Sequence, residues 1–503
     1  MIARSNRFYT MNILFIYPKF PDTFWSFKYA LKFIRKKAAY PPLGLLTVAA
    51  MLPDEFHKRL VDVNVESLTD DDLSWADLAF IGAMTVQRDS ARQIIARCKE
   101  TGLKVIAGGP LFTAEPDAFE QVDHLVLDEA ELTLPSFLED LKNGHLKKIY
   151  RASGFCNLRH TPPPAWDLID MKKYASMSIQ FSRGCPFNCD FCNVTVLFGH
   201  RPRLKSAQQV LAELDRLYDT GWRNDIFFVD DNFIGNKRYL KTRLLPALIE
   251  WRKDKKGCVF FTEASINLAD DAELLDLMVT AGFDSVFIGI ESPNDDSLTE
   301  CQKIQNRNRE LINDVRIMQR AGLQVQGGFI VGFDSDTPST FHQLIDFIQK
   351  SGIVTAMVGL LQAPPGTRLF DRLKKDNRLL AKIISGDNVD GTTNIDPKMG
   401  LDQLMNGYRY IMGHIYNPRH YYRRVKVFLR EFGDSKVDTR IDFQRFLAFF
   451  RSSIRLGILG KERFHYWYLM TWTLVRKPRL LPLAITLAIY GYHFRRICES
   501  HIL

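Results

Sequence analysis

The sequence predicts an α/β protein with two successive parallel-sheet units followed by a mainly helical C-terminal part. Short aliphatic runs alternate with amphipathic stretches in residues 11–150 and again in residues 178–376. Such runs are typical of parallel strands joined by crossover helices. From about residue 377 helical patterns and aromatic side chains dominate. At 503 residues the chain is long enough for three domains.

The composition is that of a folded protein, with 46% hydrophobic and 25% charged residues. Five of the eight cysteines are scattered singly, which predicts a reducing, cytoplasmic compartment rather than a disulfide framework. The apolar run after Met11 is short and continues into a strand pattern, so no usable signal peptide is expected.

The first unit, residues 11–150, has five predicted strands, at 12–18, 59–65, 78–84, 103–109 and 124–130. Their order along the chain favours an open, flavodoxin-like sheet whose ligand lies at the carboxyl ends of the strands. No G-x-G-x-x-G follows a strand, so a dinucleotide is not the expected ligand. The residues expected at these strand ends are Pro42, Gly44, Thr85, Gln87, Gly108, Gly109, Pro110 and Glu129. The paired glycines would let the backbone approach a bulky ligand closely.

Residues 151–177 form a predicted linker. Pro162, Pro163 and Pro164 cannot continue a helix or an interior strand, and they favour a stiff, extended connection.

The second unit, residues 178–376, has six predicted strands, at 178–184, 225–233, 259–266, 285–292, 324–333 and 355–367. Six βα-type repeats in this length predict a partial (β/α)6 barrel, open on one side, rather than a closed eight-stranded barrel. Functional residues gather at the carboxyl ends of the strands in either architecture.

Three cysteines, Cys185, Cys189 and Cys192, lie close together with C-x3-C-x2-C spacing at the start of this unit. Thiolates at this spacing favour a soft metal. On a four-iron cluster, three protein ligands leave one iron free to chelate a substrate. The alternative is a zinc site without its fourth ligand, although zinc usually takes paired C-x2-C arms.

This spacing, with Phe191 before the last cysteine, resembles the signature of the radical S-adenosylmethionine (SAM) enzymes. Residues 11–150 resemble the cobalamin-binding domain that precedes many radical SAM cores, so the resemblance covers about residues 11–376. It implies three cofactors: a [4Fe-4S] cluster, SAM and cobalamin. Two features depart from the pattern: there is no D-x-H-x-x-G, and the usual acidic GEGE loop reads Asp128-Glu129-Ala130-Glu131. A flavodoxin-like domain without a cofactor is the alternative.

The same resemblance implies a set of SAM contacts at the strand ends. They are Phe191, Asp230, Asp231, Asn232, Glu263, Ser265, Glu291, Ser292, Gly328 and Gly332. Simpler explanations stay open for two of these positions. The aspartate pair could cap a helix, and Glu291 could form a salt bridge with a barrel arginine because a buried acid needs a partner.

The C-terminal part, residues 377–503, is basic and aromatic. Nine Lys or Arg face two Asp or Glu after residue 450, a balance that suits an anionic partner or a membrane surface better than nucleic acid. The apolar segment 480–490 is too short to cross a bilayer and is flanked by arginines, which predicts an interfacial helix pair on the inner face of the membrane. Ordinary helices packed on the barrel are the alternative. This part resembles the extension found in a subset of the family that includes hopanoid methylases.

The resemblance implies methylation of an unactivated sp3 carbon of a small or lipid-like substrate, with a hopanoid among the candidates. A deoxyadenosyl radical would abstract hydrogen, methylcobalamin would deliver the methyl group, and a low-potential electron donor is required. No catalytic residue is assigned beyond the cluster ligands. The alternatives are a cobalamin-dependent oxidative cyclase and a non-catalytic iron–sulfur sensor. Methylthiolation is disfavoured because only the isolated Cys98 and Cys156 precede the cluster motif.

Overall fold

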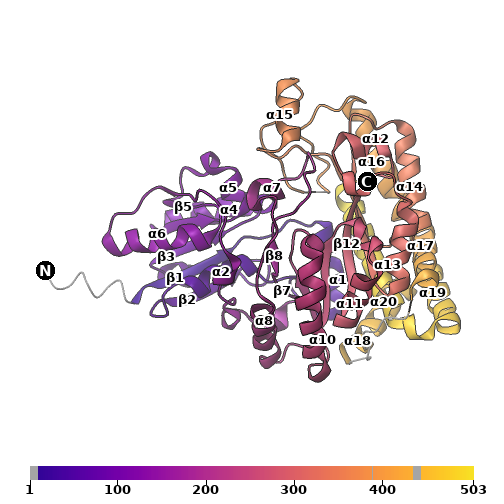
Figure 1. Ribbon diagram of the computed structural model, residues 1–503, viewed down its shortest axis with the longest axis horizontal. Coiled ribbons are helices and arrows are strands. Elements are labelled where there is room, and N and C mark those ends of the chain that lie inside the picture. The colour runs from indigo at the N-terminus through magenta and orange to yellow at the C-terminus, as the bar shows by residue number, and fades with distance from the viewer. Residues whose placement is uncertain (1–9, 388, 434–442) are drawn as a thin grey trace.

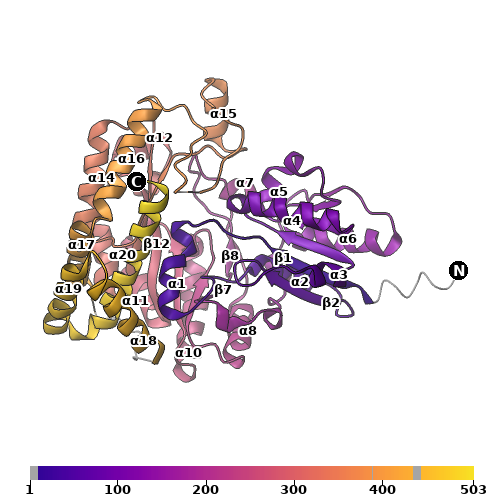
Figure 2. The same ribbon diagram turned by 180° about the vertical axis from the view of Figure 1, so that it is seen from behind.

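The fold was analysed in a computed structural model that describes residues 10–387, 389–433 and 443–503. Figure 1 shows the first sheet unit at one end of the molecule, the second unit in the middle and the C-terminal helices at the other end, and Figure 2 shows the same order from behind. Both sheets are parallel and the C-terminal part is helical, so the predicted fold class is confirmed.

The first sheet has six strands in the order β2-β1-β3-β4-β5-β6. Its strands are β1 (Asn12–Tyr17), β2 (His57–Asp62), β3 (Leu78–Gly82), β4 (Lys104–Gly108), β5 (His124–Val126) and β6 (Ile149–Tyr150), and its helices are α2 (Leu43–Met51), α3 (Asp70–Trp75), α4 (Arg88–Glu100), α5 (Pro110–Ala114) and α6 (Ala130–Asn143). Ile13 and Phe15 of β1 point into one hydrophobic core and Leu14 and Ile16 into another. Burial on both faces explains the continuous aliphatic runs. The five predicted strands are present; the two-residue β6 was too short to leave a pattern.

The second sheet runs β7-β10-β11-β12-β13-β14 without closing on itself, as expected for a partial barrel. Its strands are β7 (Met177–Ile179), β10 (Asp225–Phe228), β11 (Val259–Ala264), β12 (Phe283–Glu291), β13 (Gln324–Val331) and β14 (Ala356–Leu360). Its helices are α7 (Val194–Phe198), α8 (Ala207–Asp219), α9 (Lys237–Tyr239), α10 (Leu245–Asp254), α11 (Ala272–Ala281), α12 (Asp295–Glu300), α13 (Leu311–Ala321), α14 (Pro338–Ser351) and α15 (Arg368–Lys375). A short antiparallel ribbon, β8 (Ser182–Arg183) with β9 (Arg203–Leu204), frames the cysteine loop.

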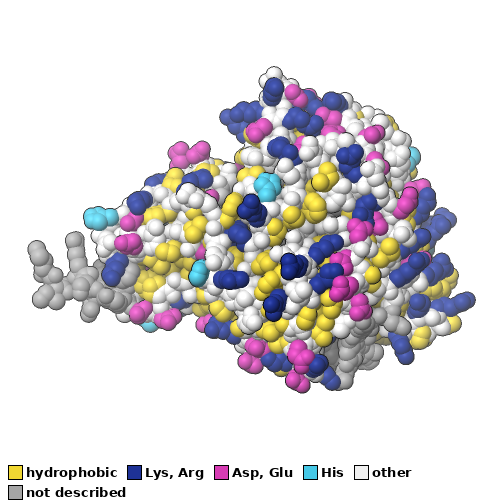
Figure 3. All heavy atoms as spheres, viewed as in Figure 1, with side chains coloured by type: hydrophobic (Ala, Val, Ile, Leu, Met, Phe, Trp, Pro, Cys, Tyr) yellow, Lys and Arg dark blue, Asp and Glu magenta, His cyan; other side chains and the backbone are white. Residues whose placement is uncertain are grey.

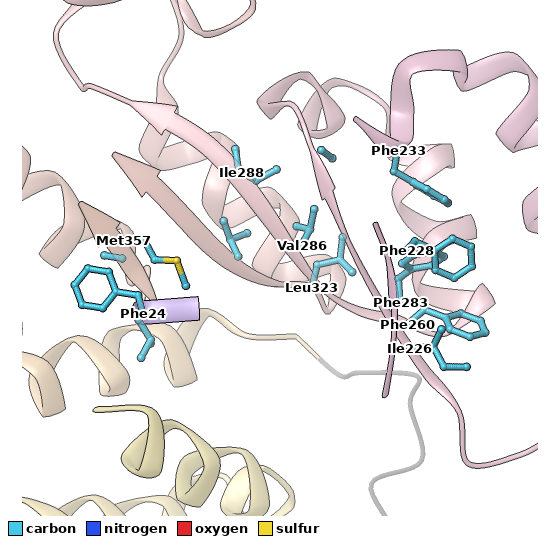
Figure 4. Packing of buried hydrophobic residues seen from close by; sticks show 14 of the residues in the cluster. Phe24, Ile226, Phe228, Phe233, Phe260, Phe283, Val286, Ile288, Leu323 and Met357 are labelled. Carbon is cyan, nitrogen blue, oxygen red and sulfur yellow. The ribbon is translucent and has the colours of Figure 1, made fainter. Parts of the chain in front are cut away.

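The two faces of the barrel sheet pack against different partners. Figure 4 shows Phe228, Phe260 and Phe283 grouped on one face, where their rings lie 5.2–5.5 Å apart. On the inner face, Phe227 and Phe261 stack with centroids 4.7 Å apart, and Tyr40 lies 5.4 Å from Phe227. Tyr40 belongs to the connection between β1 and α2, so part of the first unit reaches into the barrel.

That connection also carries α1 (Lys28–Ile34), which Figures 1 and 2 show among the barrel and C-terminal helices rather than beside the first sheet. Trp25, just before α1, packs on Phe287 of β12 with ring centroids 5.1 Å apart. No sequence pattern predicted this crossing.

The C-terminal part consists of α16 (Leu401–Ile415), α17 (Pro418–Glu431), α18 (Phe443–Ser452), the π-helical turn η12 (Ser453–Ile458), α19 (Arg463–Arg476) and α20 (Leu481–His501). Leu487, Ala488 and Phe494 of α20 are buried against the rest of the fold. Helix α20 packs on α1, α17, α18 and α19. The segment 480–490 is therefore part of an ordinary packed helix, close to the alternative given above, and an interfacial helix there is not supported. Within the described ranges, no helix is long and apolar enough to cross a membrane.

Candidate active site

The cysteine loop lies between β8 and α7 and depends on a glycine at its entrance. Gly184 has a φ of +94°, which disfavours any other residue. A Cβ atom here would lie 2.9 to 3.0 Å from the carbonyl oxygens of Phe198, Gly199 and Arg201. The chain can therefore turn into the loop only at a residue without a side chain.

Asp230 and Asp231, at the end of β10, hold the start of this loop. The buried carboxylate of Asp230 accepts hydrogen bonds from the Phe181 amide, at 3.1 Å, and from the Ser182 hydroxyl, at 2.5 Å. Asp231 accepts one from the Gly184 amide at 2.8 Å. Burial raises the pKa of Asp230 to about 7, although these hydrogen bonds act in the opposite direction. The pair thus anchors the cysteine loop and does not cap the following helix.

The three cysteine thiols are free, and amide groups approach two of them. The Asn232 amide lies 3.9 Å from the Cys185 sulfur, and the Gln305 amide 3.8 Å from the Cys189 sulfur. Hydrogen bonds to the sulfurs are one means of setting the potential of an iron–sulfur cluster. Burial raises the pKa of Cys192 to about 12, and a bound metal would stabilise its thiolate.

The donor set fits a four-iron cluster. In the described part of the chain, no three His, Cys, Asp or Glu side chains converge to hold a single metal ion. The thiolates of a [4Fe-4S] cluster bind different irons and do not need to converge on one point. From the other side, Arg368 of α15 forms an ion pair of 2.6 Å with Asp190 and so fixes the middle of the loop.

Glu291, at the end of β12, is paired with a lysine that sequence reasoning missed. Its carboxylate lies 2.6 Å from Lys303 Nζ, and its φ is +62°. Gly289 makes room for this pair, because a Cβ there would lie 2.4 Å from a Glu291 carboxylate oxygen. Burial lowers the pKa of Lys303, but the charges of Glu291 and Cys189 outweigh burial and hold it above its usual value. The expected burial of Glu291 predicted a partner of opposite charge. No sequence spacing identified Lys303 as that partner.

Glu263, on the inner face of β11, is the strand-end acid that stays available. Its carboxyl group forms no hydrogen bond or ion pair with any described residue. Burial and the nearby Asp231 and Asp230 raise the pKa of Glu263 to about 8. Next to it, Ser265 is hydrogen-bonded to the Asn232 amide at 3.2 Å. A ligand that donates hydrogen bonds would satisfy this acid.

The remaining predicted SAM residues have partners in the fold. Phe191 packs edge-on against Phe333, with ring centroids 6.4 Å apart. The Ser292 hydroxyl accepts a hydrogen bond from the Asn294 amide at 3.2 Å. Gly328 faces the Phe287 ring, 2.8 Å from the position of a Cβ, and Gly332 has a φ of +112°. Phe191 lies in the cysteine loop, Ser292 and Gly332 directly follow β12 and β13, and Gly328 lies within β13.

A cavity of about 470 Å³ separates the first sheet from the barrel at the carboxyl ends of both sets of strands. Of the residues predicted to bind cobalamin, Thr85 and Glu129 line it. From the barrel side its lining includes Asn193, Val196, Leu197, Pro364, Pro365 and Gly366. A site between domains, with glycine and proline backbone in its wall, suits a large cofactor. Asn193, Val196 and Leu197 follow the last cysteine within a few residues, so this space borders the cluster loop.

Several predicted cobalamin residues are needed by the fold itself. A Cβ on Gly108 would lie 2.5 Å from the Val126 carbonyl oxygen of the adjacent strand, so this glycine permits strand packing. Gln87 is buried. Its side-chain NH2 donates a hydrogen bond to the Pro18 carbonyl oxygen, and its side-chain oxygen accepts one from the Met84 backbone amide. Pro42 and Gly44 lie at the start of α2, and Gly109 and Pro110 follow β4 at the start of α5; none of the four lines the cavity.

Glu129 joins the two units through a buried ion cluster. Arg203 contacts both of its carboxylate oxygens at 2.8 Å, and Arg183 contacts one at 3.0 Å. Arg183 also forms an ion pair of 2.7 Å with Glu131, whose pKa is lowered because the pull of Arg183 outweighs burial. The acidic loop that replaces GEGE is therefore bound by two arginines of the barrel unit, Arg183 and Arg203.

Comparison with family models divides the chain into three matches. Residues 35–138 match the B12 binding domain, residues 179–348 match the radical SAM superfamily, and residues 367–502 match a domain of unknown function, DUF4070.

Two curated relatives align with most of the chain. An uncharacterized methyltransferase of Synechocystis is 41% identical over 97% of this chain and 92% of its own length. The hopanoid C-2 methylase of Rhodopseudomonas palustris is 33% identical over 92% of this chain and 89% of its own length. Among solved structures, the radical SAM methyltransferase TsrM of Kitasatospora setae, with cobalamin and a [4Fe-4S] cluster bound, superposes with a TM-score of 0.59 at 14% identity, covering 98% of this chain and 99% of TsrM. The structural match to TsrM shows that the two proteins share a fold.

Proposed function

The chain belongs to the cobalamin-binding radical SAM family, in the subset with the helical C-terminal extension, and we propose that it methylates an sp3 carbon of a polycyclic, lipid-like substrate. That it is a cobalamin-dependent radical SAM methyltransferase follows from the relatives and the fold. Its cofactors are a [4Fe-4S] cluster, SAM and cobalamin. The hopanoid class of substrate is the proposal, and the single observation that carries it is the 33% identity to the hopanoid C-2 methylase along nearly the whole chain.

When bound, the cluster and SAM supply a 5′-deoxyadenosyl radical, and cobalamin supplies the methyl group. Cys185, Cys189 and Cys192 would hold the cluster. Asp230 and Asp231 position that loop through the backbone amides that precede it. No base is required for hydrogen abstraction.

Two further sets of contacts are proposed. Glu263, Asn232 and Ser265 would contact SAM, because they gather beside the cysteine loop and Glu263 lacks a partner there. Cobalamin would occupy the cavity between the two units, against Thr85 and the segment 193–197. Glu129 would act at that site as a positioning residue, since arginines engage both of its carboxylate oxygens.

The remaining assignments follow the chemistry. We divide the chain into a cobalamin-binding domain (11–150), a linker (151–177), a radical SAM core (178–376) and a helical extension (377–503). A cytoplasmic location, with a low-potential electron donor as partner, suits the eight free cysteines and a reduced cluster.

The test is anaerobic reconstitution with iron, sulfide and hydroxocobalamin, followed by SAM, a reductant and a hopanoid hydrocarbon, with products identified by mass spectrometry. We expect 5′-deoxyadenosine, S-adenosylhomocysteine and a product heavier than the substrate by one methylene. Deoxyadenosine without S-adenosylhomocysteine would favour the cyclase alternative. Full activity on a tetrapyrrole and none on the hopanoid would refute the substrate class alone.

Cys192→Ala tests the cluster site, with Cys258→Ala as the matched control because both cysteines are largely buried. The first variant should lose bound iron, the cluster absorbance and all deoxyadenosine formation, whereas the control should keep them. Equal iron content in both variants would contradict the assignment.

A further inference from the structure

The helical segment formed by α18, η12 and α19, residues 443–476, presents apolar side chains to solvent. On α19 the exposed fractions are 75% for Phe464, 42% for Trp467, 57% for Tyr468, 57% for Leu474 and 78% for Val475. Their spacings of three, four and seven residues place them on one face, and the opposite face, with Leu469 and Met470, is buried. Phe450, Ile454, Ile458 and Leu459 are also exposed on the preceding helix and turn.

A basic stripe lies beside the apolar face. Arg419, Arg423, Lys426 and Arg430 of α17 are spaced by three or four residues and are partly or fully exposed, so they share one face of that helix. Helices α17 and α19 pack against each other. Figure 3 shows Lys and Arg side chains along the edge of the molecule where Figure 1 places these two helices.

Cations and rings meet where the two faces join. Lys426 lies 4.2 Å from the centroid of the Tyr468 ring, and Arg430 lies 5.6 Å from Trp472. Lys461, Arg463, Arg476 and Arg479 are exposed at the two ends of α19. By contrast Glu462, the one acid of that helical turn, is buried and paired with Arg495 at 2.6 Å. Aromatic and aliphatic side chains bordered by cations are the composition of helices that lie in a membrane interface.

We propose that α17 and α19, with the η12 turn before α19, form a docking surface for an anionic phospholipid bilayer. The exposed rings and aliphatic chains would enter the headgroup region, and the basic stripe would contact lipid phosphates. This surface differs from the segment 480–490 suggested by hydropathy, which the fold buries. The proposal does not depend on the substrate of the enzyme.

Charge favours lipid over the other candidate occupants. A second copy of this chain would place two basic stripes near one another, which opposes association at low salt. A nucleic acid would use the cations and leave the exposed aliphatic face of α19 without a partner.

The test is co-flotation of the reconstituted, full-length enzyme with phosphatidylglycerol vesicles and with phosphatidylcholine vesicles. We expect binding to the anionic vesicles that weakens as salt is raised, and at least about tenfold less binding to the neutral ones. The variant Phe464→Ser/Leu474→Ser/Val475→Ser and the variant Arg423→Glu/Lys426→Glu should each reduce binding about tenfold or more. Leu132→Ser/Ile149→Ser, which alters exposed apolar residues of the first unit, is the matched control and should bind like the unmodified enzyme.

Thermal unfolding of each variant checks that the fold is intact, as expected for exposed positions. Equal flotation of the unmodified enzyme and both variants would overturn the proposal. A dimer in sedimentation velocity that the triple serine variant dissociates, without vesicle binding, would assign this face to a second copy instead.

Discussion

The chain makes two internal interfaces of opposite character. Toward the first sheet the barrel presents arginines, and the contact is an ion cluster of Glu129, Arg183 and Arg203 beside a cavity. Where the C-terminal helices meet the β1–α2 connection the contact is aromatic: Phe494 of α20 stacks on Tyr416, at the end of α16, with centroids 5.2 Å apart, and packs against Phe24 at 5.4 Å.

The two interfaces contribute differently to the fold: the ion cluster positions the two units, and the buried rings supply stability. Buried ion pairs recover little more than their cost of desolvation, but they fix geometry because a misplaced charge is penalised. Buried rings contribute apolar area and packing. The interface that would hold cobalamin therefore fixes the relative position of the two units, and the aromatic C-terminal interface contributes most to stability. The first unit takes part in both, since Phe24 lies in its β1–α2 connection.

Removal of a ring from the aromatic interface should have the largest effect. Phe494→Ala deletes a completely buried side chain that touches three elements, and such truncations cost about 3–5 kcal/mol. Chemical denaturation measures the loss. Phe464→Ala, at an exposed ring of the neighbouring helix, is the control and should change the unfolding free energy by no more than about 0.5 kcal/mol. Similar losses in the two variants would mean that this aromatic interface does not stabilise the fold.

The polar interface should respond less strongly to an isosteric change. Glu129→Gln leaves Arg203 without a carboxylate partner, and the amide keeps part of the hydrogen bonding, so we expect a loss of about 2–3 kcal/mol. Cobalamin retention after gel filtration should fall as well, because the cavity wall loses its anchor. Asp70→Asn breaks the exposed pair with Arg97 and should cost less than about 1 kcal/mol. A stable variant that keeps cobalamin would show that this cluster does not position the two units.

The sequence predicted both sheets, because parallel strands buried on two faces leave uninterrupted aliphatic runs, as in Ile13–Ile16 of β1. The sequence also predicted that three acids lie at the carboxyl ends of strands, because in a βα repeat polar residues follow directly after each aliphatic run. Asp230, Asp231 and Glu263 accordingly surround the cysteine loop.

Contacts between distant segments left no such pattern. Lys303 meets Glu291 only after α12 turns back, and α1 reaches the barrel through a connection that reads as a loop. The segment 480–490 was misjudged for a related reason. Hydropathy measures how apolar a helix is, but whether that face meets lipid or protein depends on what packs against it. In α20 it is met by α1, whereas the more polar α19 keeps its aromatic face exposed.

A buried histidine gives the smallest and most specific test of the aromatic interface. His493 of α20 is completely buried, stacks on Phe27 with centroids 5.4 Å apart, and pairs through Nε2 with the Phe24 carbonyl oxygen at 3.0 Å. Burial lowers the pKa of His493 to about 4, against opposing contributions from the Phe24 hydrogen bond and Asp22.

Because the folded state binds this proton less readily than the unfolded chain, the neutral ring contributes full stability above pH 6.5. That contribution is lost as the pH falls toward 4. Between pH 7 and pH 5 the unmodified protein should therefore lose about 1–2 kcal/mol more unfolding free energy than His493→Asn, which cannot titrate. His57→Asn, at an exposed histidine of β2, should keep the full pH dependence. Parallel pH profiles for the unmodified protein and His493→Asn would mean that His493 titrates alike in the folded and unfolded protein, and that the aromatic interface does not keep this ring from water.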